Sequence, residues 1–253
     1  MASEAASAEP VEPTPMRRPR ADQARLVADV LRHQIHAGGY ADGLPSEADL
    51  ATEFFVSRNT VREALATLKD DGLIDRGPRT GTHVAIRKYD HGLDSLVGLK
   101  ETFKGYGDIR NEVRAAMTVS APPAVANRLQ LSPGEPAVFI ERLRFLGALP
   151  LSLDMTYLAA DIGREVVEHD LEVNDVFALI EQVTGRRLGA ANLAVEAVPA
   201  DPHSAALLQV PDGVPVLLLE RLTHLDDGRP VDLEYIRMRG DRITLRGNLV
   251  RGV

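Results

Sequence analysis

The sequence of 253 residues contains no cysteine and no tryptophan, and aromatic residues make up only 4% of it. Without cysteine the chain can form neither a disulfide framework nor a thiolate metal site, which fits a reducing cytoplasm. It has no apolar run of about 18 residues and no apolar core of a signal peptide. These absences predict a cytoplasmic protein with no membrane association.

The short motifs of the common enzyme classes are also missing. The chain has no G-x-S-x-G, no H-E-x-x-H, no Walker loop and no Rossmann glycine pattern. Its seven histidines lack the spacing of metal ligands, and His83, His203 and His224 fit surface or capping positions better. We therefore expect no catalytic residue, no metal and no cofactor.

The residues that are present suffice for a folded core, because 44% of them are apolar, and the length suits one or two domains. The net charge is −8, and nearly all of it lies beyond residue 89. A near-neutral N-terminal part can still bind nucleic acid through local basic spots. Residues 1–20 are rich in Ala, Glu and Pro, so we expect a disordered tail. Its basic end, Arg17, Arg18 and Arg20, either contacts DNA phosphate or has no role.

The segment 21–86 has the pattern of three helices followed by a hairpin. A first helix begins near Asp22 and carries apolar residues at helical spacing. A second begins at Ser46, where Ser-x-x-Asp forms an approximate capping box. The third has Ser57 as its N-cap and ends at Gly72. Its apolar stripe consists of Val61, Ala64, Leu65 and Leu68. With a tight turn between the second and third helices and two short strands around the turn GPRTG, this segment predicts a winged helix-turn-helix domain.

The third helix presents Arg58, Asn59 and Arg62 on the face opposite its apolar stripe. A helix-turn-helix offers the N-terminal part of this helix to base edges in the major groove. Arginine suits guanine and asparagine suits adenine, while Ser57 or Thr60 can reach phosphate. The alternative is an ordinary solvated helix face. The preceding helix, the tight turn and the basic hairpin tip together favour DNA.

These elements resemble the N-terminal domain of the GntR family of bacterial transcription regulators, through "LPSEADLA", "VSRNTVREAL" and "GTHV". We expect a homodimer on a palindromic double-stranded DNA operator, because one short helix reads few bases. The wing departs from the family where Arg79 replaces a common glycine and His83 a usual aromatic residue. The conformation around Pro78 is therefore left open, and Arg79 can enter the minor groove. The DNA contacts implied are Ser46, Ser57, Arg58, Asn59, Thr60, Arg62, Arg79, Thr80 and Gly81.

Beyond residues 87–95, which we expect to form a polar linker, the chain repeats itself. Residues 128–146 align with residues 207–225 at an offset of 79, and seven of 15 positions from Leu129 to Leu143 are identical. After one inserted residue, "PLSLDMTY" aligns with "PVDLEYIR". Each unit is expected to form strand, short helix, turn, strand, turn, strand. Six antiparallel strands with helices on one side predict an α+β domain with pseudo-twofold symmetry.

Residues 96–253 resemble the UTRA effector-binding domain of the HutC subfamily, which has a chorismate-lyase-like fold. The resemblance rests on "ERLRF", "PLSLDMTYL" and "RPVDLEYIRMRGDRI". It implies a sequence-specific transcription regulator, expected to be a repressor, whose operator binding is controlled by a small-molecule effector in this domain. We expect a polar or anionic metabolite, such as a sugar derivative or an organic acid.

Strand parity locates candidate ligand contacts in this domain. Two arginines share an otherwise apolar strand face, which suits an anion or a polar molecule held in a partly dry cleft. Two departures from the subfamily are Met238, where tyrosine is expected, and Asp175, where a phosphate-binding serine is common. An aspartate there would repel phosphate, which argues against a phosphosugar. The alternative is a set of ion pairs on a solvated sheet face. The candidates are Arg142, Arg144, Asp154, Asp232, Glu234 and Met238.

Two other functions are compatible with the residues. The fold is shared with a lyase, and Asp154, Glu234 and the arginines could form an acid/base site, so an enzyme is the first alternative. A binding module without DNA contacts is the second, and the recognition helix argues against it. Turnover of small acids would support the enzyme, whereas salt-sensitive binding to a palindromic duplex would support the regulator.

Overall fold

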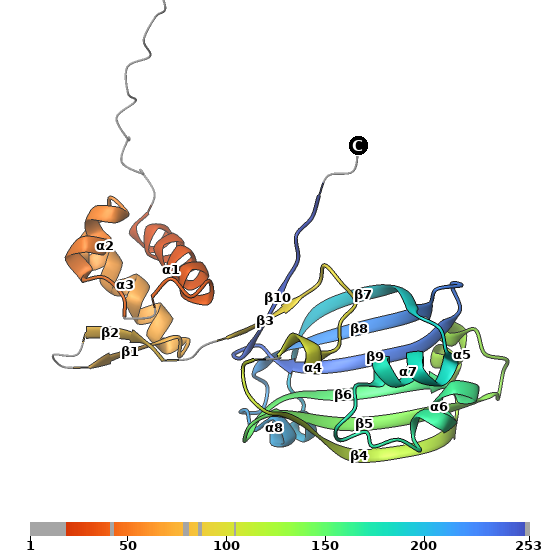
Figure 1. Ribbon diagram of the computed structural model, residues 1–253. Coiled ribbons are helices and arrows are strands. Elements are labelled where there is room, and N and C mark those ends of the chain that lie inside the picture. Colours follow the sequence, from red (N-terminus) through yellow and green to blue (C-terminus); the bar gives the residue numbers. More distant parts are fainter. Residues whose placement is uncertain (1–18, 41–42, 78–80, 86–87, 104, 251–253) are drawn as a thin grey trace, which may run out of the picture. The chain divides into compact units, whose positions relative to one another are not determined.

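The chain folds into two compact units, Met1–Arg87 and Lys88–Val253 (Figure 1). The computed structural model describes residues 19–40, 43–77, 81–85, 88–103 and 105–250. No helix in these ranges is long and apolar enough to cross a membrane.

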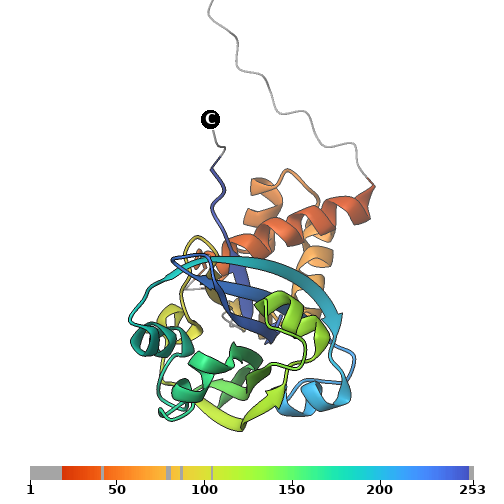
Figure 2. The ribbon, with the colours of Figure 1, turned by 90° about the vertical axis from the view of Figure 1, so that its right-hand side faces the viewer.

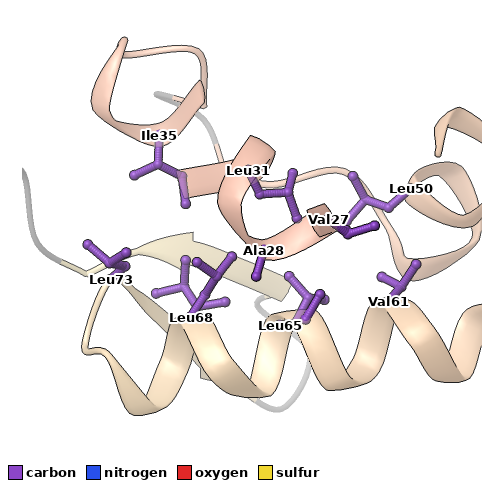
Figure 3. Packing of buried hydrophobic residues seen from close by; sticks show 11 residues of the cluster. Val27, Ala28, Leu31, Ile35, Leu50, Val61, Leu65, Leu68 and Leu73 are labelled. Carbon is purple, nitrogen blue, oxygen red and sulfur yellow. The ribbon is translucent and has the colours of Figure 1, made fainter. Parts of the chain in front are cut away.

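The first unit is a helix-turn-helix with a two-stranded antiparallel wing, as the sequence predicts. Its elements are α1 (Arg20–His36), α2 (Glu47–Glu53), α3 (Arg58–Asp70), β1 (Ile74–Gly77) and β2 (Gly81–Val84). The apolar faces of the three helices meet in one core around Leu31, Leu50 and Leu65. Figure 3 shows α1 and α3 facing each other across these side chains. Because the apolar stripe of α3 points into this core, its polar side is turned outward.

Hydroxyl caps determine where α2 and α3 begin. The side chains of Ser46 and Ser57 each accept a hydrogen bond from the backbone N–H three residues later, at 3.2 and 3.1 Å. Both predicted N-caps are therefore present. Gly72 follows the end of α3 with φ at 69°, a left-handed conformation that glycine adopts without strain. The start of α1 differs from the prediction, because Pro19 occupies the N-cap position and Asp22 lies within the first turn.

The second unit is built on a six-stranded antiparallel sheet in the order β4-β5-β6-β9-β8-β7. Its elements are β3 (Tyr89–Gly92), α4 (Leu99–Thr102), β4 (Ile109–Ser120), α5 (Pro123–Leu129), β5 (Pro136–Leu146), β6 (Leu149–Ala159), α6 (Ala160–Val166), α7 (Val176–Thr184), β7 (Leu188–Pro199), α8 (Pro202–Leu208), β8 (Pro215–Leu225), β9 (Pro230–Arg239) and β10 (Ile243–Arg246). The internal repeat forms two half-sheets, β4-α5-β5-β6 and β7-α8-β8-β9, which meet where β6 pairs with β9. Gln130 and Gln209, which the repeat aligns, both cap the short helix of their half in the left-handed conformation, with φ at 56° and 54°.

Helices cover both faces of this sheet, whereas the sequence predicted them on one side. α6 and α7 pack over Val138 and Ile140 of β5. α8 packs on the opposite face over Leu143, and α5 packs there over Leu222 and Leu233. In Figure 2 the two pairs of helices lie on either side of the strands. The central strands are buried on both faces, so a single layer of helices could not cover them.

Residues 87–95, expected to be a polar linker, contain the strand β3. It pairs in parallel with β10 near the other end of the chain. His91 on this strand is buried, and the ring of Tyr89 meets that of Phe103 edge-on, with the centroids 5.7 Å apart. Polar composition was misleading here because only some side chains of the strand face the core, and the partner strand is distant in sequence.

Candidate functional site

The outward side of α3 carries three of the predicted DNA contacts. Arg58, Asn59 and Arg62 are exposed. Arg58 makes no ion pair with any residue that the structure describes. The Nε of Arg62 donates to Glu47 Oε2 of α2 at 2.7 Å, and Arg76 of β1 contacts the other oxygen of the same carboxylate. The hydrogen bond from Arg62 is the main reason that the pKa of Glu47 is lowered. The start of α3 therefore presents one unpaired and one paired guanidinium to the surface.

Thr60, the remaining predicted contact on α3, differs from its neighbours because it is 1% exposed. Its hydroxyl lies 2.8 Å from that of Ser57, so it contributes to the cap of the helix, and its contact with phosphate stays a prediction. Ser46 and Ser57 are exposed at the two caps, and Gly81 is exposed at the start of β2. Arg79 and Thr80 lie outside the described residues.

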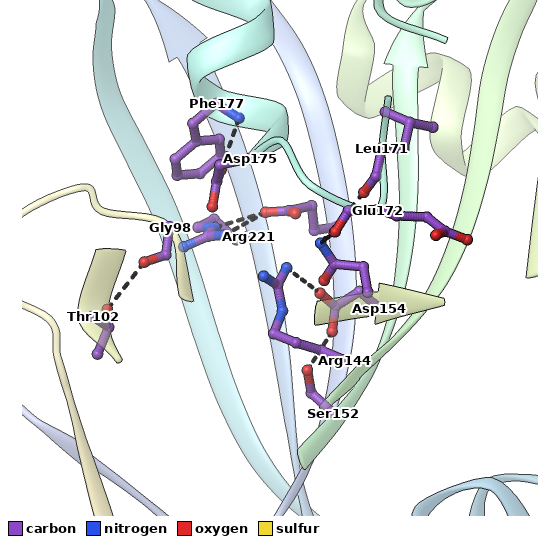
Figure 4. A network of polar contacts seen from close by, with 12 residues as sticks. Gly98, Thr102, Arg144, Ser152, Asp154, Leu171, Glu172, Asp175, Phe177 and Arg221 are labelled. Carbon is purple, nitrogen blue, oxygen red and sulfur yellow. Dashed lines mark hydrogen bonds and ion pairs between the residues drawn. The ribbon is translucent and has the colours of Figure 1, made fainter. Parts of the chain in front are cut away.

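A stripe of buried polar side chains crosses the sheet face under α7 (Figure 4). On β5 and β6, Arg142 lies opposite Asp154 and Arg144 lies opposite Ser152. On β8 and β9, Arg221 lies opposite Glu234. The structure thus brings the predicted arginines and carboxylates onto one face, and it buries them. The members of this buried polar stripe, all at most 6% exposed, are Asn111, Arg142, Arg144, Ser152, Asp154, Thr156, Arg221, Thr223, Asp232 and Glu234.

Two ion pairs organise the stripe. Arg144 Nη2 donates to Asp154 Oδ2 at 2.8 Å, and the hydroxyl of Ser152 donates to the other oxygen at 2.6 Å. Arg221 donates through Nε and Nη2 to one oxygen of Glu234, at 2.8 and 2.6 Å. The solvated ion pairs considered in the sequence analysis are therefore buried ones, for which loss of one partner is costly.

The charge states of the two aspartates differ because of their neighbours. Burial acts to raise the pKa of Asp154, but Arg144, Arg142 and the hydrogen bond from Ser152 outweigh it, and the pKa is lowered. Burial also raises the pKa of Asp232, and the nearby carboxylate of Glu234 adds to the rise, so its pKa lies well above the usual range. The surroundings therefore favour the ionised form of Asp154 and the neutral form of Asp232.

Several buried polar atoms of the stripe have no hydrogen-bond partner among the described residues. They include donors on Arg142 and Arg144 and acceptors on Asp232 and Asn111. Asp175, the N-cap of α7, adds its Oδ2 to this set. Buried polar groups are normally satisfied, so a set of unsatisfied ones at a single location is a candidate binding site.

A cavity of about 820 Å³ opens beside the stripe. Asn111 and Asp175 line it and also carry unsatisfied oxygens. Apolar side chains of Phe103, Ile109 and Val173 form part of its wall. The polar stripe therefore adjoins a space large enough for a small molecule.

The sequence analysis missed Arg221 and Asn111 as members of this site and included Met238, which packs in an apolar cluster with Phe103 and Ile243. Arg221 could have been found, since the repeat aligns it with Arg142 at the offset of 79. Asn111 carries no motif, and it enters the site only because β4 pairs with β5 so that it lies opposite Arg144.

A winged helix-turn-helix with exposed arginines on its recognition helix, joined to a sheet domain with a buried polar site, defines a DNA-binding regulator with a ligand-sensing domain. Residues 23–84 match the family described as bacterial regulatory proteins, gntR family, and residues 106–244 match the UTRA domain. The chain belongs to the GntR family of transcription regulators and has the HutC-type architecture, with a UTRA domain after the DNA-binding domain.

Related proteins match over most of the chain. The HTH-type transcriptional repressor NagR of Bacillus subtilis is 27% identical over 214 residues, which cover 79% of this chain and 83% of NagR. The mannosyl-D-glycerate transport/metabolism system repressor MngR of Escherichia coli is 28% identical over 218 residues, 84% of this chain and 89% of MngR. The crystal structure of PhnF from Mycobacterium smegmatis matches with a TM-score of 0.66 at 26% identity, covering 89% of this chain and all of that one. The family and these named repressors are regulators, which rules out the enzyme alternative.

Proposed function

We propose that this protein is a repressor that binds a palindromic operator as a homodimer and releases it when a small molecule occupies the buried polar stripe of the UTRA domain. The observation that carries the proposal is the set of buried arginine and carboxylate atoms without partners, in a chain that also has an outward-facing recognition helix. NagR and MngR are named repressors, and a relative that is 26% identical is named a probable repressor of a fructoselysine utilization operon. These names support a polar metabolite as the effector and action in the cytoplasm.

In this proposal Arg58 and Asn59 read base edges in the major groove. Arg62 also contacts DNA in this proposal, after its ion pair with Glu47 breaks. Breaking the pair costs little, because an exposed ion pair of this kind contributes little stability. Contacts to the DNA backbone come from Ser46 and Ser57 at the helix caps and from Arg79, Thr80 and Gly81 of the wing.

A homodimer follows from the small number of bases that one helix can read. Two copies would place their α3 helices in successive major grooves on half-sites about 34 Å apart. Sedimentation analysis with a selected operator duplex tests this, with a complex of two chains per duplex as the expected result. A monomer that binds the same duplex with undiminished affinity would contradict it.

The DNA contacts are tested on duplexes selected from a random library with the purified protein. Arg58→Ala and Arg62→Ala should each reduce affinity by about 1–3 kcal/mol, and loss of a base-reading arginine should also relax the sequence preference. Arg164→Ala, which removes an exposed arginine of α6, is the matched control and should leave affinity unchanged. Wild-type affinity in both α3 variants would show that the recognition helix is wrongly assigned.

A further inference from the structure

The two halves of the sheet use equivalent arginines differently. Arg221 lies opposite Glu234 and pairs with it. The repeat aligns these two residues with Arg142 and Asp154, which also lie opposite each other. Asp154, however, is paired with Arg144, an arginine that the second half lacks at the aligned position. Arg142 therefore has no carboxylate partner among the described residues, whereas its counterpart Arg221 is paired with Glu234.

Arg142 is left as a buried cation with free hydrogen-bonding capacity. It is 2% exposed and makes no ion pair with a described residue. Its Nε and Nη1 have no acceptor among the described residues. A guanidinium that is buried without a partner is costly, and an anionic group of a ligand would remove that cost.

A buried acceptor at the start of α7 is the counterpart of this cation. Asp175 Oδ1 caps the helix by accepting from Phe177 N at 3.0 Å, and its Oδ2 is buried with no donor among the residues that the structure describes. Gly98 lies so close that a Cβ there would come within 1.9 Å of Oδ2. The negative charge of Asp175 acts on both Arg142 and Arg144, although no ion pair joins it to either. The site thus holds one unpaired positive and one unpaired negative side chain near each other.

Three arginines and three carboxylates offset one another in this site: Arg142, Arg144 and Arg221, with Asp154, Asp175 and Glu234. Burial and the carboxylate of Glu234 raise the pKa of the fourth carboxyl group, that of Asp232, which favours its neutral form. A doubly charged anion such as a phosphate ester would leave this buried region with excess negative charge, which is unfavourable at low dielectric. A molecule with one positive and one negative group would satisfy both unpaired side chains and keep the balance.

We propose that the effector is a zwitterion with neighbouring amino and carboxylate groups, as in an α-amino acid. Its carboxylate binds Arg142 and its ammonium group binds Asp175. The rest of the molecule extends into the cavity of about 820 Å³ that Asp175 lines, along Phe103, Ile109 and Val173. This assignment rests on the proposed function, because it takes the buried polar stripe as the effector site.

Three probes with six-carbon chains test the charge requirement. L-Norleucine carries both charges, hexanoate only the negative one and hexylamine only the positive one. Thermal unfolding of the full-length protein should show stabilisation by millimolar L-norleucine, because a ligand that binds only the folded state raises its stability. Hexanoate and hexylamine should bind at least about tenfold more weakly, since each leaves one buried charge unmet. The proposal is wrong if hexanoate binds as tightly as L-norleucine, or if L-norleucine does not stabilise the protein. Both results are obtained with the wild-type protein alone.

A charge-only substitution tests Asp175 directly. Asp175→Asn retains a side chain that caps helices well but removes the negative charge. The preference for L-norleucine over hexanoate should disappear, and inorganic phosphate, which should not stabilise the wild type, should now do so. Asp201→Asn is the matched control, because Asp201 caps α8 by the same kind of contact and is exposed. Phosphate that stabilises the wild type as strongly as Asp175→Asn would overturn the proposal.

Operator binding measured on the same preparations separates this inference from the proposed function. If phosphate releases the operator from the wild-type protein, the proposal of a zwitterionic effector is wrong, while the proposal that the protein is a repressor still holds. Failure to select any operator duplex would overturn the repressor, while the probe series would still decide which charges the buried site accepts.

Discussion

Asp154 and Asp232 lie on the same sheet face, yet replacing each with asparagine should affect stability differently. Asp154 is ionised and paired, so Asp154→Asn should lower the free energy of unfolding at pH 7 by about 3–5 kcal/mol. Asp232 has a raised pKa, so its contribution to stability is present at low pH and is lost as pH rises through that pKa. Asp232→Asn resembles the protonated form and should leave stability at pH 7 unchanged or increased. Urea unfolding of both variants measures this, and a large loss of stability in Asp232→Asn would contradict a raised pKa of Asp232.

His91 should make stability depend on pH below neutrality. Burial, together with the positive charges of Arg221 and Arg144, lowers its pKa from 6.5 to about 4. Between these values the unfolded chain binds a proton that the folded protein does not, so stability should fall as pH falls from about 6.5 to about 4, by up to roughly 3 kcal/mol. His91→Gln should flatten this part of the curve, whereas the same change at exposed His203 should not. Parallel curves for wild type and His91→Gln would show that His91 does not cause the dependence.

Strand parity was sufficient to group Arg142 with Arg144 and to select Asp154 from the sequence. It could not show which carboxylate each arginine contacts, because that depends on the register between strands and on the length of each side chain. The unpaired state of Arg142 arises from such a choice: Asp154 lies opposite Arg142 but pairs with Arg144. The burial of Thr60 was not predictable for a related reason, since its hydroxyl turns toward Ser57 inside the cap.

At the scale of elements, the cap of α3 should affect both stability and DNA binding. Ser57 accepts from the N–H of Thr60 and contacts its hydroxyl. Ser57→Ala should cost about 1 kcal/mol of stability, whereas Ser57→Asn should cost little, because asparagine caps equally well. Since the cap orients the turn that carries Arg58, operator affinity should fall in the alanine variant more than in the asparagine one. Thermal unfolding and duplex titration check the two effects, and equal losses of operator affinity in both variants would show that the contact of the hydroxyl with DNA matters more for affinity than its role as a cap.

The helices and hairpins with strong local signals were predictable, as the caps of α2 and α3 and the repeated strands show. The strand β3 was not, because its partner β10 follows more than a hundred residues later and its own composition is polar. The placement of helices on both faces was also missed. It follows from the burial of the central strands on both sides, which becomes evident only when the order β5-β6-β9-β8 is known.

At the scale of the whole molecule, operator and effector should influence each other's binding equally. If occupation of the buried polar stripe weakens operator binding, the coupling should be about 1–3 kcal/mol, or roughly 5- to 150-fold in affinity. Thermodynamic linkage requires the operator to weaken effector binding by the same factor. Calorimetric titration of the stabilising probe with and without operator duplex measures this. Equal probe affinities in the two titrations would mean that ligand binding to the UTRA domain is not coupled to operator binding by the DNA-binding domain.

The single strand pair that joins the two half-sheets also has a consequence for biosynthesis. Within each half the strands are near neighbours in sequence, so they can pair locally. The pairing of β6 with β9 can form only after β9 has been synthesised. As the chain leaves the ribosome, the first half emerges with Arg144 and Asp154 already able to pair, but with the backbone of β6 unprotected along one edge. An unpaired strand edge is a site of association between nascent chains. Slow translation between residues 160 and 230 would prolong that exposure, so the yield of native protein should depend on how quickly the ribosome translates this segment.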